Sequence, residues 1–445
     1  MKVEHGAVIQ KFKPFVTVLS NENHGSYCES CFLKRTSLKS CTACKTIKYC
    51  GVQCQRREWN IHKLECKCLK NTAPNVPLPS VRMMLRLIIK EKLDCEDDQG
   101  DYGIWRRGFA DLMSHSDDIK TDSKRCEQLT QIMFTLSSLT KGVMELPSAQ
   151  HILEIFGKML TNSFTICNGE IQSLGVGLYL GASWIDHSCD PNAVIVFEGN
   201  TLVLRAVKAI QILSTRDISV SYIDLLPTTK DRKDALREQY YFECTCSHCS
   251  NCDIMDQKKL CIKCQDNSCT GFCVKTGNTF QCCNKCGLSI SENNSLLEEF
   301  EKETENKLTE IKEAKDSKDA DLVLRLAKQY RNKYNRILHP LSLRHTKLAD
   351  AMFDACIDLG NWTDALVYGL QTIEPYRQYY PSFSPILGVQ YMKIGKLQLY
   401  LQRFQDALNS LKKAESIISV THGKDHSLYV ELAEMLHQTC QEMQM

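Results

Sequence analysis

The sequence has no apolar run near the roughly 18 residues that a membrane-spanning helix requires. Its first residues, MKVEHGAVIQKFKP, lack the apolar core and the cleavage site of a signal peptide. A formal net charge of +2 provides no strong positive field that would attract nucleic acid or an anionic membrane surface. We therefore expect no membrane partner, and DNA binding that is weak or absent.

Most of the composition is ordinary, and cysteine is the exception. The chain has 445 residues, of which 43% are hydrophobic and 24% charged, so it is long enough for about two to four globular domains. Its 25 cysteines are concentrated in two segments, 28–68 and 244–286. Dense Cys-x-x-Cys clusters without a signal peptide favour zinc sites over disulfides. The pattern indicates a reducing compartment, and we expect the protein in the cytoplasm and the nucleus.

The first cysteine segment has the spacing of a two-zinc module. Its eight potential ligands are Cys28, Cys31, Cys41, Cys44, Cys50, Cys54, His62 and Cys66. Eight ligands fit two tetrahedral Zn²⁺ ions, one bound by four cysteines and one by three cysteines and a histidine. A segment of about 40 residues buries too little apolar surface to fold alone, so zinc would replace a hydrophobic core.

This spacing resembles that of a MYND zinc finger. The resemblance implies interleaved sites, with Cys28, Cys31, Cys50 and Cys54 on one ion and Cys41, Cys44, His62 and Cys66 on the other. MYND fingers commonly bind proline-rich peptides, so the resemblance also implies such peptides as partners. The many lysines and arginines of the segment are compatible with an ordinary solvated face or with weak, nonspecific contact with nucleic acid. The peptide is the favoured partner.

The second cysteine segment begins with three thiols that leave a zinc site incomplete. Cys244, Cys246 and Cys249 lie within CTCSHC, and a tetrahedral structural site needs a fourth ligand. Cys189 is a candidate, because it is a lone cysteine in the turn-like stretch HSCDPN. An ordinary buried thiol is the alternative.

A further zinc site could lie in the insert that follows. CIKC and CNKC offer a ribbon-like set, Cys261, Cys264, Cys283 and Cys286. Three other cysteines, Cys269, Cys273 and Cys282, leave the ligand set ambiguous. We therefore expect three zinc ions, with a fourth as an open alternative.

Several stretches around the lone cysteine resemble a SET domain. They are NSFTICN (162–168), GVGLYL (175–180), HSCDPN (187–192), SVSYIDLL (219–226) and YYFECTCSHC (240–249). Together with the MYND pattern and a helical end, they make the chain resemble the SMYD family of protein lysine methyltransferases over nearly its whole length. The resemblance implies an α+β fold, in which a SET β-fold carries an inserted MYND zinc finger, a post-SET zinc cluster and a C-terminal TPR-like α-helical domain.

The expected order of domains follows from these motifs. It is an N-terminal SET remnant (1–27), the MYND finger (28–66), a linker and helical SET insert (67–160), the SET core (161–243), a post-SET cysteine cluster with the ribbon-like insert (244–290) and the TPR-like domain (291–445). Residues 161–223 show strand and turn signals, and GN at 199–200 predicts a hairpin. The motifs GNWTDAL and QRFQDAL recur 42 residues apart, which favours helix–turn–helix repeats over two unrelated amphipathic helices.

The resemblance implies transfer of a methyl group from S-adenosyl-L-methionine to a lysine of a protein or peptide, histone or non-histone, in transcriptional or chromatin regulation. Because the sulfonium is already activated, the enzyme has to align and desolvate the lysine amine. Aromatic rings suit this task, since their faces attract methylammonium groups. By the family pattern, Tyr222 would be the catalytic tyrosine and Tyr240 would line the lysine channel. Residues that would hold the cofactor are Asn162, Ser183, His187 and Phe242.

Two features depart from the family pattern. The family usually has asparagine before His-Ser-Cys, whereas this chain has Asp186, which can only accept hydrogen bonds when ionised. Such a carboxylate could bind the α-ammonium of the cofactor or repel its carboxylate. The glycine-rich G-x-G turn of the family is also absent from the 27 residues before Cys28. The alternative function is therefore a catalytically impaired adaptor that recruits partners through the MYND finger and the helical domain.

Overall fold

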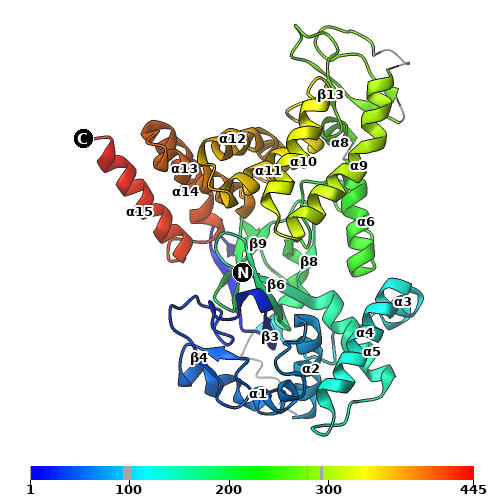
Figure 1. Ribbon diagram of the computed structural model, residues 1–445, viewed down its shortest axis with the longest axis vertical. Coiled ribbons are helices and arrows are strands. Elements are labelled where there is room, and N and C mark those ends of the chain that lie inside the picture. The colour runs from blue at the N-terminus through cyan, green and yellow to red at the C-terminus, as the bar shows by residue number, and fades with distance from the viewer. Residues whose placement is uncertain (1, 94–102, 252, 278, 291–293, 445) are drawn as a thin grey trace. The chain divides into compact units, whose positions relative to one another are not determined.

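Residues 2–93, 103–251, 253–277, 279–290 and 294–444 are described in the computed structural model of the chain, which Figure 1 shows as a ribbon. The chain divides into two units. The first consists of residues 1–222 and 235–243, and the second of residues 223–234 and 244–445. Among the described residues, no helix combines the length and the apolarity that crossing a membrane requires.

Two antiparallel sheets of three strands form the centre of the first unit. The first sheet contains, in order, β2 (Val8–Phe12), β10 (Thr201–Ala206) and β9 (Ala193–Glu198). The second contains β3 (Val16–Leu19), β7 (Ser173–Leu178) and β6 (Ser163–Cys167). Gly199, at φ 63°, closes the β9–β10 hairpin, which confirms the turn expected at GN.

Helices pack on one another beside the second sheet of this unit. They are α1 (Val52–Thr72), α2 (Pro79–Lys92), α3 (Ser116–Thr121), α4 (Ser123–Thr140) and α5 (Ala149–Asn162). α2 packs against α1, α4, α5 and β3, and every residue from Val81 to Ile89 is buried. This complete burial includes two arginines, so α2 must find charged partners inside the unit.

Three pairs of short strands complete the first unit. They are β1 (Lys2–Val3) with β11 (Ile210–Gln211), β4 (Lys39–Ser40) with β5 (Lys48–Tyr49), and β8 (Asp186–His187) with β12 (Ser219–Val220). Within the stretch SVSYIDLL, only Ser219 and Val220 form a strand, β12. Pairing stops after two residues because β8 runs into a turn, where the Asp190 amide donates to Ser188 Oγ at 3.1 Å.

The second unit contains most of the remaining helices. A helix shared with the first unit, α6 (Thr229–Tyr240), is followed by α7 (Ser247–Ser250), α8 (Asp253–Lys259) and two small hairpins, β13 (Ile262–Lys263) with β14 (Phe272–Cys273) and β15 (Lys275–Thr276) with β16 (Thr279–Phe280). The helices that follow are α9 (Ser295–Asp316), α10 (Ala320–Lys333), α11 (Leu343–Asp358), α12 (Trp362–Tyr379), α13 (Pro385–Tyr400), α14 (Phe404–Thr421) and α15 (Ser427–Glu442).

The repeat expected in this helical part is confirmed. GNWTDAL and QRFQDAL begin α12 and α14, the second helices of the packed pairs α11–α12 and α13–α14. The second pair packs closely at Gly395, where an added Cβ would lie 2.6 Å from Leu411 Cδ2. Successive helix pairs of this kind are the unit of TPR-like domains.

Candidate functional site

Two groups of metal-ligand side chains lie in the segment 28–66. They are Cys28, Cys31, Cys50 and Cys54, and Cys41, Cys44, His62 and Cys66, and the ligand atoms of each group lie within 4.8 Å of one another. The Cys31 and Cys50 sulfurs are 3.9 Å apart, and those of Cys41 and Cys66 are 3.8 Å apart. Such distances suit thiolates placed about 2.3 Å from a shared tetrahedral Zn²⁺. The grouping is the interleaved one that the MYND resemblance implies.

His62 is oriented for metal binding by a carboxylate behind it. Its Nε2 lies 3.7 Å from Cys44 Sγ, and its Nδ1 lies 3.0 Å from Glu65 Oε2. When Nδ1–H donates to the carboxylate, Nε2 keeps its lone pair for the metal. His62 and Glu65 are both fully buried, so this orientation is shielded from water.

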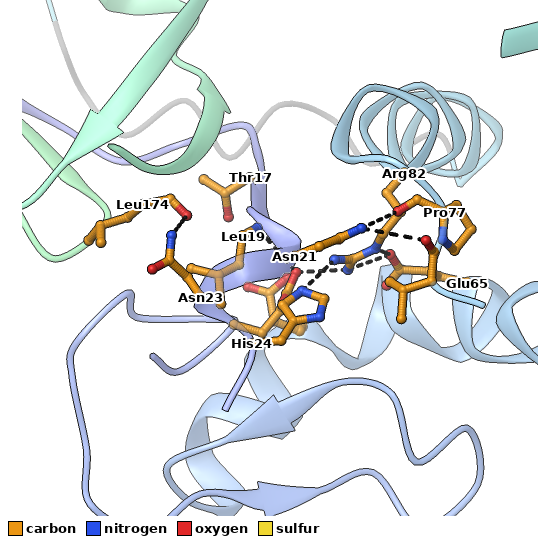
Figure 2. A network of polar contacts seen from close by, with 12 residues as sticks. Thr17, Leu19, Asn21, Asn23, His24, Glu65, Pro77, Arg82 and Leu174 are labelled. Atoms are coloured by element: carbon orange, nitrogen blue, oxygen red, sulfur yellow. Dashed lines mark hydrogen bonds and ion pairs between the residues drawn. The ribbon is translucent and has the colours of Figure 1, made fainter. Parts of the chain in front are cut away.

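Glu65 also belongs to a buried ion-pair network that joins the zinc-binding segment to α2 (Figure 2). Arg82 Nη2 donates to Glu65 Oε1 at 2.9 Å and to Glu29 Oε1 at 2.7 Å. The three side chains are at most 1% exposed. Figure 2 also shows the Arg82 guanidinium meeting His24, whose Nε2 is 3.4 Å away. Arg82 is thus a buried cation with two buried carboxylate partners.

Arg86, one turn further along α2, extends the network. It donates to Glu58 Oε2 at 2.8 Å and to the Thr17 carbonyl of β3, and its Nε lies 3.3 Å from Glu65 Oε2. Burial alone would raise the pKa of Glu65, but the charges of Arg86 and Arg82 hold it well below its usual range. The zinc-binding segment therefore supplies the anions that allow α2 to be buried.

Aromatic side chains from the ends of β8, β12 and α6 gather around Tyr222. The centroid of its ring lies 5.0 Å from that of Tyr240, 5.3 Å from that of His187 and 6.4 Å from that of Phe242. These separations are typical of tilted and edge-to-face aromatic contacts. The structure thus brings together four of the residues predicted for catalysis and cofactor binding. Aromatic faces arranged in this way can attract an alkylammonium group.

His187 is held in one orientation at the edge of this aromatic cluster. Its Nδ1 accepts the backbone N–H of Tyr222 at 3.1 Å, so the neutral ring carries its proton on Nε2. Nε2 in turn lies 3.3 Å from the Cys189 sulfur. The ring therefore connects the lone cysteine of HSCDPN with the strand end that carries Tyr222.

The two tyrosines of the cluster remain protonated at neutral pH. Burial, with smaller contributions from the Asp186 charge and from Tyr240, raises the pKa of Tyr222 well above its ordinary value. Burial also raises the pKa of Tyr240. The Tyr222 hydroxyl donates to the Ile185 carbonyl. The phenols can orient a nitrogen group through hydrogen bonds, but they are poor bases.

The HSCDPN stretch is bonded to strand β12 and the turn before it. β8 and β12 pair in parallel, with His187 opposite Val220. The Asn192 side chain accepts from the Ser219 amide at 2.9 Å and donates to the Asp217 carbonyl at 2.8 Å. Asparagine can do both because its amide carries a donor and an acceptor. These bonds fix the two segments beside each other and so fix the position of His187.

Arg107, which sequence reasoning missed, holds the predicted cofactor residue Ser183. It donates to the Ser183 carbonyl at 2.5 Å and to Ser183 Oγ at 3.2 Å, and its guanidinium carbon lies 4.4 Å from the centre of the Trp184 ring. Its Nε is buried and has no hydrogen-bond partner. Because Arg107 lies 76 residues earlier in the chain, no local pattern could have pointed to it.

Asp186 has a cationic neighbour in Arg107. Burial lowers the pKa of Arg107, and the charges of Asp111, Tyr222 and Asp186 oppose that shift. The side chain of Asp186 is exposed, at the edge of the aromatic cluster. This part of the molecule therefore presents a carboxylate and a guanidinium together, which suits a ligand that carries both charges.

Like Ser183, the predicted site residues Asn162 and Cys189 are not part of the aromatic cluster. Asn162 ends α5, and its Nδ2 donates to the Lys158 carbonyl at 3.0 Å and the Met113 carbonyl at 3.2 Å. Its carbonyl oxygen is the atom that it would offer to a cofactor. Cys189 belongs to the first unit, whereas its three predicted co-ligands belong to the second. Their binding of one zinc, like the role of Asn162, stays a prediction.

The ligand set expected for the ribbon-like insert needs one correction. The thiols that lie within 4.8 Å of one another are those of Cys264, Cys269, Cys283 and Cys286. Cys261, predicted from CIKC, is instead 3.4 Å from His339 Nδ1. The reason is that β13 runs along residues 337–339, where the Lys263 amide donates to the Ile337 carbonyl at 2.8 Å, and this carries Cys261 away from the other thiols.

Comparison with known proteins agrees with the motifs. Residues 28–66 match the family model described as the MYND finger. The chain is 34% identical over 437 residues to "Histone-lysine N-methyltransferase SMYD3" of Homo sapiens, covering 97% of this chain and 92% of that protein. It is 31% identical over 452 residues to "Histone-lysine N-methyltransferase ASHR1" of Arabidopsis thaliana, covering 97% and 90%. It is 28% identical over 432 residues to "N-lysine methyltransferase SMYD2" of Gallus gallus, covering 97% and 92%.

Proposed function

Because the chain belongs to the SMYD family of protein lysine methyltransferases, we propose that the aromatic cluster around Tyr222 receives the substrate lysine. The chain is an S-adenosyl-L-methionine-dependent protein lysine N-methyltransferase. The observation that carries the proposed site is the convergence of Tyr222, Tyr240 and Phe242 on His187. The adaptor alternative is not favoured, since relatives matched over most of their own length are named as methyltransferases.

The aromatic cluster prepares the lysine amine by removing it from water. Burial disfavours the charged form of an amine and lowers its pKa, so the attacking nitrogen can lose its proton before transfer. The faces of Tyr222 and Tyr240 stabilise the alkylammonium character that grows as the nitrogen gains a methyl group. No protein group has to act as a strong base, which fits the protonated state of both phenols.

Tyr222 orients the nitrogen. Its O–H is directed to the Ile185 carbonyl, so its oxygen lone pairs can accept an N–H of the incoming amine. This places the amine lone pair along one direction, which is the alignment that an in-line displacement requires. When bound, S-adenosyl-L-methionine supplies the activated methyl group on its sulfonium.

The cofactor side of the site is formed by His187, Ser183, Asn162 and Phe242 in our proposal. The methionine end of the cofactor carries one ammonium and one carboxylate. Asp186 offers an acceptor for the ammonium, and the buried Nε of Arg107 offers a donor for the carboxylate. The residues present therefore fit the group, and Asp186 in place of the usual asparagine is compatible with cofactor binding.

Calorimetry with S-adenosyl-L-methionine on the zinc-loaded protein tests this site. The wild-type chain is expected to bind, and Arg107→Met is expected to weaken binding by about tenfold or more, since hydrogen bonds to charged groups contribute roughly 1.5–3 kcal/mol. Arg106→Met is the matched control, because the exposed neighbour loses the same charge.

Two results would count against the proposal. If folded wild-type protein binds no cofactor, the proposed methyl-transfer site is wrong for this chain. If Arg107→Met binds as tightly as Arg106→Met, then Arg107 has no part in holding the cofactor, although the aromatic cluster could still do so.

We further propose that the MYND finger, a protein-interaction module, binds proline-rich peptides. Three of its large apolar side chains are exposed, Leu33 at 41%, Val52 at 55% and Trp59 at 42%. Exposed apolar and aromatic side chains suit the preformed, extended backbone of such peptides. The formal net charge of +2 gives the chain no strong attraction for nucleic acid, so duplex DNA serves as the comparison ligand.

Titration with a synthetic polyproline peptide tests the finger. Val52→Asp is expected to weaken peptide binding by about tenfold, because a charge replaces an apolar contact worth roughly 1.5–3 kcal/mol. Val52 is not a zinc ligand, so the zinc content of the variant should equal that of the wild type. Tighter binding of duplex DNA than of the peptide would reverse this assignment of partner.

We propose the cytoplasm and the nucleus as the location of the protein. Among the described residues, the cysteine sulfurs are not joined in disulfides, as a reducing compartment requires. Histone and non-histone lysines are equal candidates as substrates. Microscopy of the tagged full chain, together with nuclear fractionation, would measure how the protein is divided between the nucleus and the cytoplasm. Recovery only from an oxidising secretory compartment would contradict this location.

A further inference from the structure

We propose that the insert after α8 binds a zinc ion of its own, separate from the MYND sites and from the methyl-transfer site. Four thiols converge there, those of Cys264, Cys269, Cys283 and Cys286. The Cys264 and Cys286 sulfurs are 3.5 Å apart, and those of Cys269 and Cys283 are 3.7 Å apart. The family model that matches the chain ends at residue 66, so it says nothing about this segment.

The distances favour a metal over disulfides. Bonded sulfurs lie about 2.05 Å apart, whereas two thiolates that share a tetrahedral Zn²⁺ at about 2.3 Å each are separated by nearly 4 Å. All four ligand atoms lie within 4.8 Å of one another, so one ion can reach all of them. Four thiolates form a closed structural site with no open position for chemistry.

The backbone around the thiols is shaped for thiolates. The Gly271 amide lies 3.3 Å from Cys269 Sγ, and the Lys285 amide lies 3.4 Å from Cys283 Sγ. N–H groups that point at sulfur stabilise its negative charge and orient the ligand. At Gly271 an added Cβ would lie 2.5 Å from Cys283 Sγ, so only glycine leaves room for the ligand.

The remaining cysteines of the insert are placed differently. Cys261 faces His339, Cys273 is fully buried in the apolar core, and Cys282 is exposed with its sulfur 3.2 Å from Ser289 Oγ. Each is close in sequence to a proposed ligand but outside the group of four. The chain therefore provides its own matched control variants.

The zinc ion would hold the insert against α9, α11 and the segment between α10 and α11. Ile262, Cys264 and Cys283 belong to the same buried cluster as Phe300 of α9 and Leu338, which follows α10. Lys275 of β15 pairs with Glu301 of α9, which also accepts from Arg344 of α11 at 2.6 Å. The insert has only two-residue strands, so without a metal it would have little structure of its own to maintain these contacts.

Native mass spectrometry of the full chain tests the proposal by counting zinc ions. Cys269→Ser and Cys286→Ser should each carry one zinc fewer than the wild type. Cys282→Ser, which changes a neighbouring exposed thiol, should carry the same number as the wild type. Cys286→His should restore the lost ion, since imidazole can replace one thiolate in such a site.

Three outcomes would overturn the assignment. Cys269→Ser and Cys286→Ser could keep the zinc count of the wild type, or Cys282→Ser could lose an ion as they do. The denatured wild-type chain, prepared without reductant and with its free thiols alkylated, could also have the mass of a protein with two disulfides. Intact cofactor binding by Cys286→Ser would show that its remaining fold is native, so failure of this proposal and failure of the methyl-transfer site are measured separately.

Discussion

Tyr222→Phe is expected to lower kcat for lysine methylation by about 10²- to 10³-fold, the usual loss when one oriented hydrogen-bonding group of a preorganised site is removed. The phenylalanine keeps the ring that packs on Tyr240, but it loses the oxygen that would accept the amine N–H. Affinity for S-adenosyl-L-methionine should change little, because the hydroxyl faces the lysine side of the site in our proposal. The measurement is transfer of a labelled methyl group to core histones and to a lysine peptide array.

Tyr179→Phe is the matched control for this experiment. Tyr179 is also a buried tyrosine whose hydroxyl donates to a backbone carbonyl, that of Asn200, at 2.6 Å. It lies outside the aromatic cluster, so its loss should affect stability and leave the rate per folded molecule unchanged. A Tyr222→Phe enzyme as fast as the wild type would remove Tyr222 from the mechanism. An equal loss of rate in Tyr179→Phe would show that the effect is structural.

Arg82→Met is expected to lower the free energy of unfolding of the first unit by about 3–5 kcal/mol, the cost of leaving one member of a buried ion network without its partner. The two carboxylates that Arg82 binds, Glu29 and Glu65, are 1% and 0% exposed, so water cannot replace the lost cation. The effect should also reach His62, because Glu65 holds its Nδ1. Urea denaturation in the presence of zinc measures the loss.

Lys11→Met provides the comparison for Arg82→Met. Lys11 and Glu198 also form a close ion pair, at 2.7 Å, but their side chains are 50% and 37% exposed. Exposed pairs of this kind contribute about 0–1 kcal/mol, so the variant should unfold near the wild-type urea concentration. Equal destabilisation by the two substitutions would mean that burial does not determine the strength of the Arg82 network.

The sequence predicts those parts of the molecule that depend on residues a few positions apart in the chain. Two Cys-x-x-Cys pairs and the histidine that follows them indicate the MYND ligands, and the GN turn indicates the β9–β10 hairpin. The aromatic cluster required a family pattern, because Tyr222 and His187 are brought together by a strand pair of only two residues. A periodicity argument cannot find a contact of that kind.

The correction to the ligand set of the insert has a physical cause that also places the arginines of α2 inside the first unit. Either Cys261 or Cys269 could complete the ligand set around Cys264. The contacts of β13 and Cys261 with Ile337 and His339, about 75 residues away, hold Cys261 apart, so Cys269 is the ligand. Arg82 and Arg86 likewise resemble the solvent face of an amphipathic helix when α2 is considered alone. They are buried because distant glutamates reach them. When the interaction partner of a residue comes from a remote segment, the local sequence around that residue does not reveal it.

The buried arginines of α2 also determine how the finger can be studied and how it could have evolved. A deletion of residues 28–66 would remove Glu29, Glu58 and Glu65 together, and Arg82 and Arg86 would remain in an apolar interior without anions. Such a deletion would report on misfolding and not on lost partner binding. Substitutions of exposed residues of the finger, such as Val52, can instead separate the effect on partner binding from the effect on methyl transfer. In this chain the finger and α2 form one folded structure, and the finger could not be exchanged between proteins without α2.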